Sequence, residues 1–180
     1  MIETVGIIGA GTMGNGIAQI CAAAGLNVTM VDISDAAVQR GLKTVGGSLD
    51  RLVSKEKMTA ADRDATLARI NATTDKSKLA ACDLVIEAAT ENEELKVKIL
   101  RDLCAGLKPS ALVATNTSSI SITRLAASTD RPDRFIGMHF FNPAPVMKLV
   151  EVVSGLASSH ETLHRLESIA RRWGKTPVHA

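Results

Sequence analysis

A histidine and a carboxylate stand on either side of a proline-rich link, and they are the residues best suited to acid–base chemistry. His139 lies near the end of the apolar run Phe135–Phe141, and Glu151 lies in a second run, Lys148–Val153. Both runs predict strands, and the intervening Asn142-Pro143-Ala144-Pro145 excludes a helical connection. A hairpin-like return would place the carboxylate beside one ring nitrogen and leave the other to accept a proton. Such a pair suits the oxidation of an alcohol, although a single histidine near a turn is more often structural.

Two further polar residues could hold the oxygen of such a substrate. Ser118 lies in the run Thr115-Asn116-Thr117-Ser118-Ser119 after another apolar segment, and Asn142 follows the histidine strand directly. Each also has a plain structural reading, Ser118 as a turn residue and Asn142 as part of an Asx-Pro turn. The sequence leaves both readings open.

The start of the chain carries a dinucleotide-binding signature. Gly9-Ala10-Gly11-Thr12-Met13-Gly14 matches G-x-G-x-x-G, follows a strand signal and opens a helical pattern. The first glycine permits a tight turn, the second a close approach of a pyrophosphate, and the third close packing of helix on strand. Asp32 ends the next strand, about 20 residues after the middle glycine, where a carboxylate binds ribose hydroxyls. This pattern predicts NAD in preference to NADP.

The elements around these residues predict a Rossmann-type α/β fold, doubly wound on a mostly parallel sheet, in one domain over residues 1–180. The texture of residues 34–70 is long, charged and helix-favouring, and Thr59 with Asp62 resembles a helix start, which predicts a helical hairpin inserted after the second strand. Ser158 with Glu161 predicts the start of a last helix, which extends to about Trp173. The remaining predicted elements are strands at Thr4–Ile8, Asn27–Val31, Asp83–Ala88 and Ala111–Thr115, a helix at Glu94–Leu107, and a strand that begins at Pro177.

Composition excludes several classes of function. A net charge of +2 from 21 basic and 19 acidic residues, with one Trp and no Tyr, argues against a nucleic-acid partner. The three cysteines match no metal or disulfide pattern, so we expect no metal site and buried free thiols. The glycine-interrupted amino terminus is neither a signal peptide nor a membrane span, and we expect a cytoplasmic protein without membrane contact.

The motifs together resemble the NAD-binding domain of 3-hydroxyacyl-CoA dehydrogenases, nearest to the bacterial branch that acts on 3-hydroxybutyryl-CoA. The resemblance rests on GAGTMGNGIAQ, ENEELKVK, NTSS and HFFNPAPVMKLVE, and it extends over essentially the whole chain. It implies that His139 is the catalytic base, Glu151 its partner, and Ser118 and Asn142 the contacts to the substrate oxygen. The cofactor residues that we predict, from the resemblance and from the glycine and NTSS motifs, are Gly9, Gly11, Thr12, Met13, Gly14, Asp32, Glu91, Lys96 and Asn116.

The resemblance also implies an acyl-CoA substrate, bound through Ser48 and Lys55 on the helical hairpin. Arg51, Lys55 and Lys57 form a basic cluster that could meet its phosphates, or else a solvated helix face. Lys96 likewise has a plain alternative, an ion pair with the neighbouring Glu93 or Glu94.

Members of this family continue into an all-helical domain that forms a homodimer and covers the substrate, and this sequence does not include it. Because an uncovered site stays wet, we expect the chain to bind NAD but to turn over slowly. Two alternatives stand beside this prediction. One is a 3-hydroxyisobutyrate or 6-phosphogluconate type dehydrogenase, which uses lysine chemistry and lacks the set His139, Asn142 and Glu151. The other is a non-catalytic NAD-binding or scaffold module.

Overall fold

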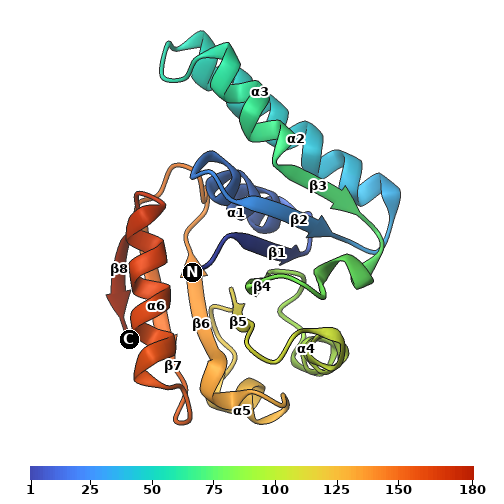
Figure 1. Ribbon diagram of the computed structural model, residues 1–180, viewed down its shortest axis with the longest axis vertical. Helices are drawn as coiled ribbons and strands as arrows, with labels where there is room; N and C mark the ends of the chain where they lie inside the picture. The colour runs from blue at the N-terminus through green and yellow to red at the C-terminus, as the bar shows by residue number, and fades with distance from the viewer.

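The computed structural model describes residues 1–180 and contains one eight-stranded sheet in the order β3-β2-β1-β4-β5-β6-β7-β8 (Figure 1). Strands β1 to β6 are parallel, β7 is antiparallel to β6, and β8 is parallel to β7. This confirms the doubly wound, mostly parallel α/β fold. The strands are β1 Thr4–Ile8, β2 Asn27–Val31, β3 Ile70–Thr73, β4 Leu84–Glu87, β5 Leu112–Thr115, β6 Phe135–Phe140, β7 Leu149–Ser154 and β8 Thr176–His179.

Helices cover both faces of the sheet. They are α1 Thr12–Ala23, α2 Asp35–Ser54, α3 Ala60–Ala68, α4 Glu93–Gly106, α5 Ile122–Ala127 and α6 His160–Arg172, with short 3₁₀ turns η1 Lys76–Leu79 and η2 Pro132–Arg134. One core cluster joins the sheet to α1, α2 and α6, and a second joins it to α4 and α5. Strands β4 and β5 are buried along their whole length, as expected for central strands covered on both faces.

The predicted helical hairpin is present as α2 and α3, which extend away from the sheet (Figure 1). The hydroxyl of Ser34 accepts a hydrogen bond from Ala37 N at the start of α2, and the hydroxyl of Thr59 accepts one from Asp62 N at the start of α3. These caps satisfy backbone donors that a helix leaves unpaired at its first turn. The inner face of α2 packs Val38, Val45 and Leu49 into the core, while α3 is mostly exposed.

Three local expectations differ from the structure. Helix α6 is capped by Ser159, whose hydroxyl accepts from Thr162 N, so the prediction of a cap at Ser158 is wrong by one residue. Ser158 is occupied elsewhere, since its hydroxyl donates to Phe135 O and accepts from Gly155 N. Strand β3 and helix α5 were not predicted, because each is too short to show a clear period in sequence.

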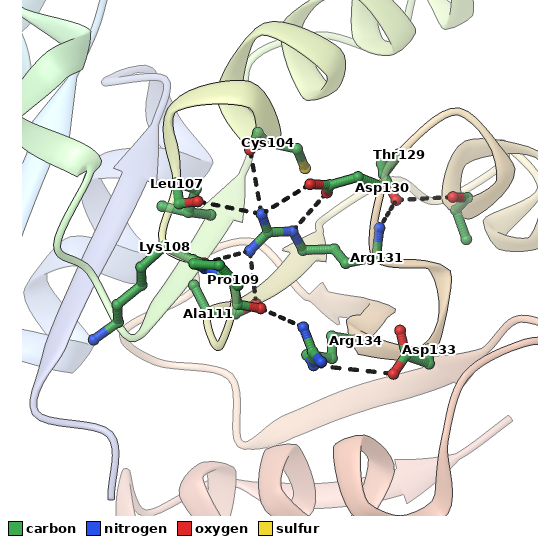
Figure 2. A network of polar contacts seen from close by, with 11 residues as sticks. Cys104, Leu107, Lys108, Pro109, Ala111, Thr129, Asp130, Arg131, Asp133 and Arg134 are labelled. Carbon is green, nitrogen blue, oxygen red and sulfur yellow. Dashed lines mark hydrogen bonds and ion pairs between the residues drawn. The ribbon is translucent and has the colours of Figure 1, made fainter.

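A buried arginine lies at the amino-terminal edge of the sheet, which is the edge where the parallel strands begin (Figure 2). Arg131 is 2% exposed and donates to four backbone carbonyls at the end of α4 and in the α4–β5 connection, at distances of 2.7 to 3.4 Å. The carbonyls are those of Cys104, Leu107, Lys108 and Ala111. Its Nε also donates to Asp130 Oδ1 at 2.9 Å. The arginine therefore supplies the donors that the end of α4 lacks.

The three cysteines are free and buried, as expected. Burial raises the pKa of the Cys82 thiol and of the Cys104 thiol to about 11, and it also raises the pKa of Cys21. A thiol with a raised pKa holds little reactive thiolate near neutral pH, so these side chains are part of the core. No helix is both long enough and apolar enough to span a membrane.

Candidate functional site

The glycine turn between β1 and α1 has the geometry that a dinucleotide phosphate requires. Gly9 has a φ of 105°, in the left-handed region, and a Cβ placed on Gly14 would lie 1.8 Å from the Gly9 carbonyl oxygen. A Cβ placed on Gly11 would meet no protein atom within 4 Å outside its chain neighbours, so that position opens onto free space. Helix α1 begins there with no side-chain cap and no acidic residue in its first turn. Its backbone N–H groups and positive dipole end are available to an anion.

Asp32 is held in place by the same turn. Its Oδ2 accepts a hydrogen bond from Ala10 N at 2.8 Å, and its Oδ1 accepts one from Ile33 N at 2.7 Å. The carboxylate stands at the boundary of two hollows. One is polar, about 290 Å³, and includes Arg40 of α2, and the other is mostly apolar and about 350 Å³. A carboxylate between a phosphate-binding turn and an apolar hollow suits the ribose of a dinucleotide.

The apolar hollow beside Asp32 was not predicted. It is lined by residues of η1 and α4 together with Ile33, which is 90% exposed although it is a large apolar residue. Its size and lining fit an adenine ring. Ile33 directly after the predicted ribose-binding Asp32 is the signal that could have revealed it, whereas Leu79 and Leu103 join it only through the fold.

Glu91, Lys96 and Asn116 come together at the carboxyl ends of β4 and β5, where they line a cavity of about 240 Å³ with Met13. Glu91 accepts hydrogen bonds from the hydroxyls of Thr117 and Ser119, at 2.9 and 3.1 Å. The side-chain oxygen of Asn116 accepts from Phe140 N at 2.8 Å, which ties β5 to β6. The sequence prediction that these residues share one site is thus consistent with their positions.

The plain alternative for Lys96 is wrong. Its ammonium forms an ion pair with Glu87, the last residue of β4, and not with Glu93 or Glu94. Glu93 pairs instead with Arg124 at 2.9 Å. Lys96 is 1% exposed, whereas a pair with its helical neighbours would have left it at the surface.

His139 and Glu151 are in contact, as the sequence predicts. They are cross-strand partners on β6 and β7, and His139 Nδ1 lies 3.2 Å from Glu151 Oε1. The imidazole is 21% exposed and the carboxylate 37% exposed, so both side chains can be reached from solution. The Phe141 ring packs edge-on against the imidazole with ring centroids 4.7 Å apart, which limits the rotation of the histidine.

Ser118 and Asn142 lie in the loops that follow β5 and β6, at the same edge of the sheet. Both residues are exposed, and neither side chain hydrogen-bonds within the chain. The Asn142–Pro143 peptide bond is cis. The structure therefore leaves the serine hydroxyl and the asparagine amide available to a ligand.

Ser48 and Lys55 line a cavity of about 770 Å³ between the hairpin, α1, the β6–β7 loop and the end of α6. Five basic side chains line this cavity and no acidic one does. They are Arg51, Lys55, Lys57, Arg172 and Lys175. Arg172 and Lys175 were not predicted, because they lie more than a hundred residues from the hairpin in sequence. The basic cluster of the hairpin is therefore one wall of a cationic hollow, which suits phosphate groups.

Comparison with known proteins agrees with this geometry. The family described as "3-hydroxyacyl-CoA dehydrogenase, NAD binding domain" matches residues 4–180. A 3-hydroxybutyryl-CoA dehydrogenase of Bradyrhizobium diazoefficiens is 51% identical over 175 residues, which are 97% of this chain and 60% of that protein. A 3-hydroxyadipyl-CoA dehydrogenase of Escherichia coli is 48% identical over 98% of this chain and 37% of its own length.

Solved structures give the same result. The crystal structure of (S)-3-hydroxybutyryl-CoA dehydrogenase from Ralstonia eutropha superposes with a TM-score of 0.98 and 60% identity, over 99% of this chain and 63% of that chain. This chain thus spans less than two thirds of the length of these relatives. It belongs to the 3-hydroxyacyl-CoA dehydrogenase family, and residues 4–180 correspond to the NAD-binding domain of that family.

Proposed function

We propose that this chain carries the NAD-dependent interconversion of a 3-hydroxyacyl-CoA and a 3-ketoacyl-CoA, with 3-hydroxybutyryl-CoA as the preferred substrate. The observation that carries the proposal is the contact of 3.2 Å between His139 Nδ1 and Glu151 Oε1 at the carboxyl edge of the sheet. In open α/β sheets this edge is where ligands bind. Relatives at 51% and 48% identity are named for 3-hydroxyacyl-CoA substrates, which supports the substrate class.

The histidine and glutamate act as a general base. With its proton on Nδ1, His139 donates to Glu151 and leaves Nε2 free to take the proton of the substrate hydroxyl. The carboxylate then stabilises the imidazolium that forms. Bound NAD would supply the acceptor for the hydride that leaves the carbon bearing this hydroxyl. In the reverse direction the imidazolium returns its proton to the carbonyl oxygen.

Ser118 and Asn142 orient the substrate oxygen. Both side chains are exposed at the edge of the sheet that carries His139, and both lack a partner within the chain. A hydroxyl and an amide can each donate a hydrogen bond to an alcohol or ketone oxygen. Donors held in fixed positions favour the geometry in which the reacting oxygen faces the imidazole.

The cationic cavity of about 770 Å³ receives the coenzyme A portion of the substrate. Ser48 and Lys55 provide a hydroxyl and an ammonium from α2 and its end, and Arg172 provides a guanidinium from the opposite wall. Phosphate groups form strong charge-assisted hydrogen bonds with such side chains. We propose that residues 1–180 act as one cofactor-binding domain and that residues 34–70 are its substrate-binding insertion.

NAD is bound in preference to NADP. The Asp32 carboxylate is fixed by two backbone N–H groups beside the glycine turn, where it would repel a 2′-phosphate. Arg40 lines the same hollow and is the residue that could attract this phosphate. The Asp32 carboxylate is nearer to the glycine turn than Arg40 is, since it accepts a hydrogen bond from Ala10 N directly. It therefore governs the preference for NAD over NADP.

The test is a pair of histidine variants assayed with acetoacetyl-CoA, with NADH and NADPH in parallel. His139→Gln should lower kcat/KM by about 10²–10⁴ because the base is lost, while the Kd for NAD stays within about twofold of wild type. His160→Gln is the matched control, since His160 is exposed at the start of α6. Wild-type activity should be faster with NADH than with NADPH.

Three results would count against the proposal. Equal rates for wild type and His139→Gln would remove the base assignment. Equal use of NADH and NADPH would remove the role of Asp32. NAD binding without any turnover by wild type would favour the alternative of a nucleotide-binding module.

A further inference from the structure

Three buried side chains form a hydrogen-bonded triad under the cofactor crevice. Glu87 and Thr115 are 0% exposed, and Lys96 is 1% exposed. The Lys96 ammonium pairs with Glu87 Oε1 and lies 3.2 Å from Thr115 Oγ1, while the threonine hydroxyl donates to Glu87 Oε1 at 2.7 Å. The other oxygen of Glu87 accepts from Ala89 N at 2.8 Å. Each of the three side chains thus has at least two hydrogen-bond contacts, and both oxygens of Glu87 are paired.

The triad lies at the point where the strand order of the sheet reverses. Glu87 and Thr115 are the last residues of β4 and β5 and are cross-strand partners. Strand β4 pairs with β1, which carries the glycine turn, and the β1–β4 junction is where doubly wound sheets bind dinucleotides. Lys96 lines the cavity of about 240 Å³ at this junction, next to Met13 and Ala89.

An ion pair at this place is costly for the fold. Moving two charges out of water costs several kcal/mol per ion, and a well-packed apolar pair is often as stable. The residues two positions earlier on the same face, Val85 and Val113, are apolar and fully buried. The sheet therefore tolerates apolar residues in this layer, and the charges at its carboxyl end point to a role in binding.

The arrangement leaves the Lys96 ammonium with one free N–H group, and the Lys96–Glu87 pair as a whole carries no net charge. An ammonium has three N–H groups, of which two are directed at Glu87 and Thr115. Glu91 is the only other ionisable residue that lines the same cavity. An unpaired lysine here would repel the positive nicotinamide ring of NAD and would not repel the neutral ring of NADH.

We propose that Glu87 is a positioning residue that neutralises Lys96 and thereby sets the balance between NAD and NADH binding. This inference rests on the proposed function, because it takes the crevice as the nicotinamide site. Removing the carboxylate exposes the cofactor to a bare cation, and removing the lysine exposes it to a bare anion. The two changes shift the affinity ratio of NAD to NADH in opposite directions.

The experiment measures Kd for NAD, NADH and ADP-ribose by titration calorimetry on the 180-residue protein. Glu87→Gln should weaken NAD relative to NADH by at least about tenfold, because at an effective dielectric constant near 20 one uncompensated charge has an effect of this size even at a separation of about 12 Å. Lys96→Met should shift the ratio toward NAD. The double variant should return the ratio to within about twofold of wild type, because it restores neutrality.

ADP-ribose separates this inference from the proposed function, since it lacks the nicotinamide ring. A wild-type protein that fails to bind ADP-ribose would contradict the cofactor site itself. Equal losses of NAD and NADH affinity in Glu87→Gln, with an unchanged ratio, would show a purely structural pair and overturn the inference. If thermal unfolding shows that Glu87→Gln is not folded, the ratio of NAD to NADH affinity is compared between Lys96→Met and the double variant, because these two proteins differ only at position 87. An identical ratio in those two proteins would also overturn it.

Discussion

The two edges of the sheet, where the parallel strands begin and where they end, both hold polar side chains, but these side chains differ in how many of their hydrogen-bonding groups are paired within the chain. At the amino-terminal edge, all three guanidinium nitrogens of Arg131 donate to protein acceptors (Figure 2). At the carboxyl edge, His139 uses one ring nitrogen, and Ser118 and Asn142 use no side-chain atom. Of these residues, only those at the carboxyl edge keep unpaired hydrogen-bonding groups. Paired polar groups such as those of Arg131 stabilise the fold, whereas the unpaired groups of His139, Ser118 and Asn142 are available to bind a ligand.

The largest effect on stability is expected from Arg131→Met. The substitution removes the Arg131 hydrogen bond from four backbone carbonyls at the end of α4 and in the α4–β5 connection, of which only those of Cys104 and Lys108 also accept from a backbone N–H of this connection. Breaking such a buried network costs about 3–5 kcal/mol in free energy of unfolding. Urea denaturation followed by circular dichroism measures this loss. Arg134→Met is the control, because Arg134 is 41% exposed and should cost less than about 1 kcal/mol. A loss of less than about 1 kcal/mol for Arg131→Met would contradict the structural role of the paired groups at the amino-terminal edge.

The glycine turn offers a test in which one residue belongs to the fold and the next to the ligand. In Gly14→Ala the new Cβ would overlap the Gly9 carbonyl oxygen, so we expect a loss of about 1–3 kcal/mol in stability together with weaker NAD binding. In Gly11→Ala the new Cβ meets no protein atom, and φ at this position is −69°. We therefore expect unchanged stability and weaker NAD binding, measured by thermal unfolding and calorimetry. Stability losses of equal size in both variants would contradict this distinction.

Lys175 combines features of both edges. It is 8% exposed, and its ammonium donates to Ala144 O and Met147 O, both at 2.7 Å, in the loop that follows Asn142. Lys175→Met should lower the free energy of unfolding by about 1–2 kcal/mol, since both carbonyls lose their donor. It should also raise KM for acetoacetyl-CoA, because this loop borders the cationic cavity. An unchanged KM would limit Lys175 to a structural role.

The pH dependence of this effect has a definite sign. Burial, and secondarily the charge of Lys148, lower the pKa of Lys175 from its usual value of 10.5. As the pH rises, Lys175 therefore loses its proton at a lower pH in the folded protein than in the unfolded chain. Its contribution to the free energy of unfolding consequently rises with pH, up to about pH 10.5. The deficit of Lys175→Met should be larger at about pH 10 than at about pH 7. A deficit that shrinks over this range would contradict the assignment.

Much of the carboxyl edge could be predicted because its signals are local in sequence. The backbone of the glycine turn adopts conformations and close contacts that few residues other than glycine allow, so the motif is visible in sequence. Asp32 follows it at a spacing set by one βαβ unit. The pair His139 and Glu151 was also accessible, since antiparallel strands joined by a short link bring cross-strand residues together. The cap at Thr59, which was predicted, acts over three residues and is likewise local.

The parts that were missed depend on contacts between distant segments. Glu87 appears in sequence as a single acid in an apolar strand, and its partner Lys96 has two nearer glutamates that the local rule favours. Only the packing of α4 over β4 and β5 determines which glutamate it meets. Arg172 reaches the hairpin cavity for the same reason, through the packing of α6. A carboxylate inside an otherwise apolar run is the sequence signal of such a pair, because a buried charge needs a partner.

The smallest effect is expected at Asp83, which extends the comparison to the surface of the amino-terminal edge. Its carboxylate accepts from Lys108 Nζ at 2.6 Å and from the backbone N–H groups of Glu3 and Thr4. Burial acts to raise the pKa of Asp83, but these hydrogen bonds outweigh it and hold the pKa below its usual value of 3.8.

Because the folded pKa lies below the unfolded one, Asp83 stabilises the protein above about pH 4, and this stabilisation is lost as the pH falls through the folded pKa. Asp83→Asn should therefore cost about 0.5–1 kcal/mol near neutral pH, a small value because Lys108 is 38% exposed and solvent screens the pair. Urea denaturation of both proteins at several pH values measures the difference, which should vanish toward about pH 2. A stability difference between the two proteins that persists in acid would contradict this prediction. It would mean that Asp83 stabilises this edge through hydrogen bonds that do not depend on its charge.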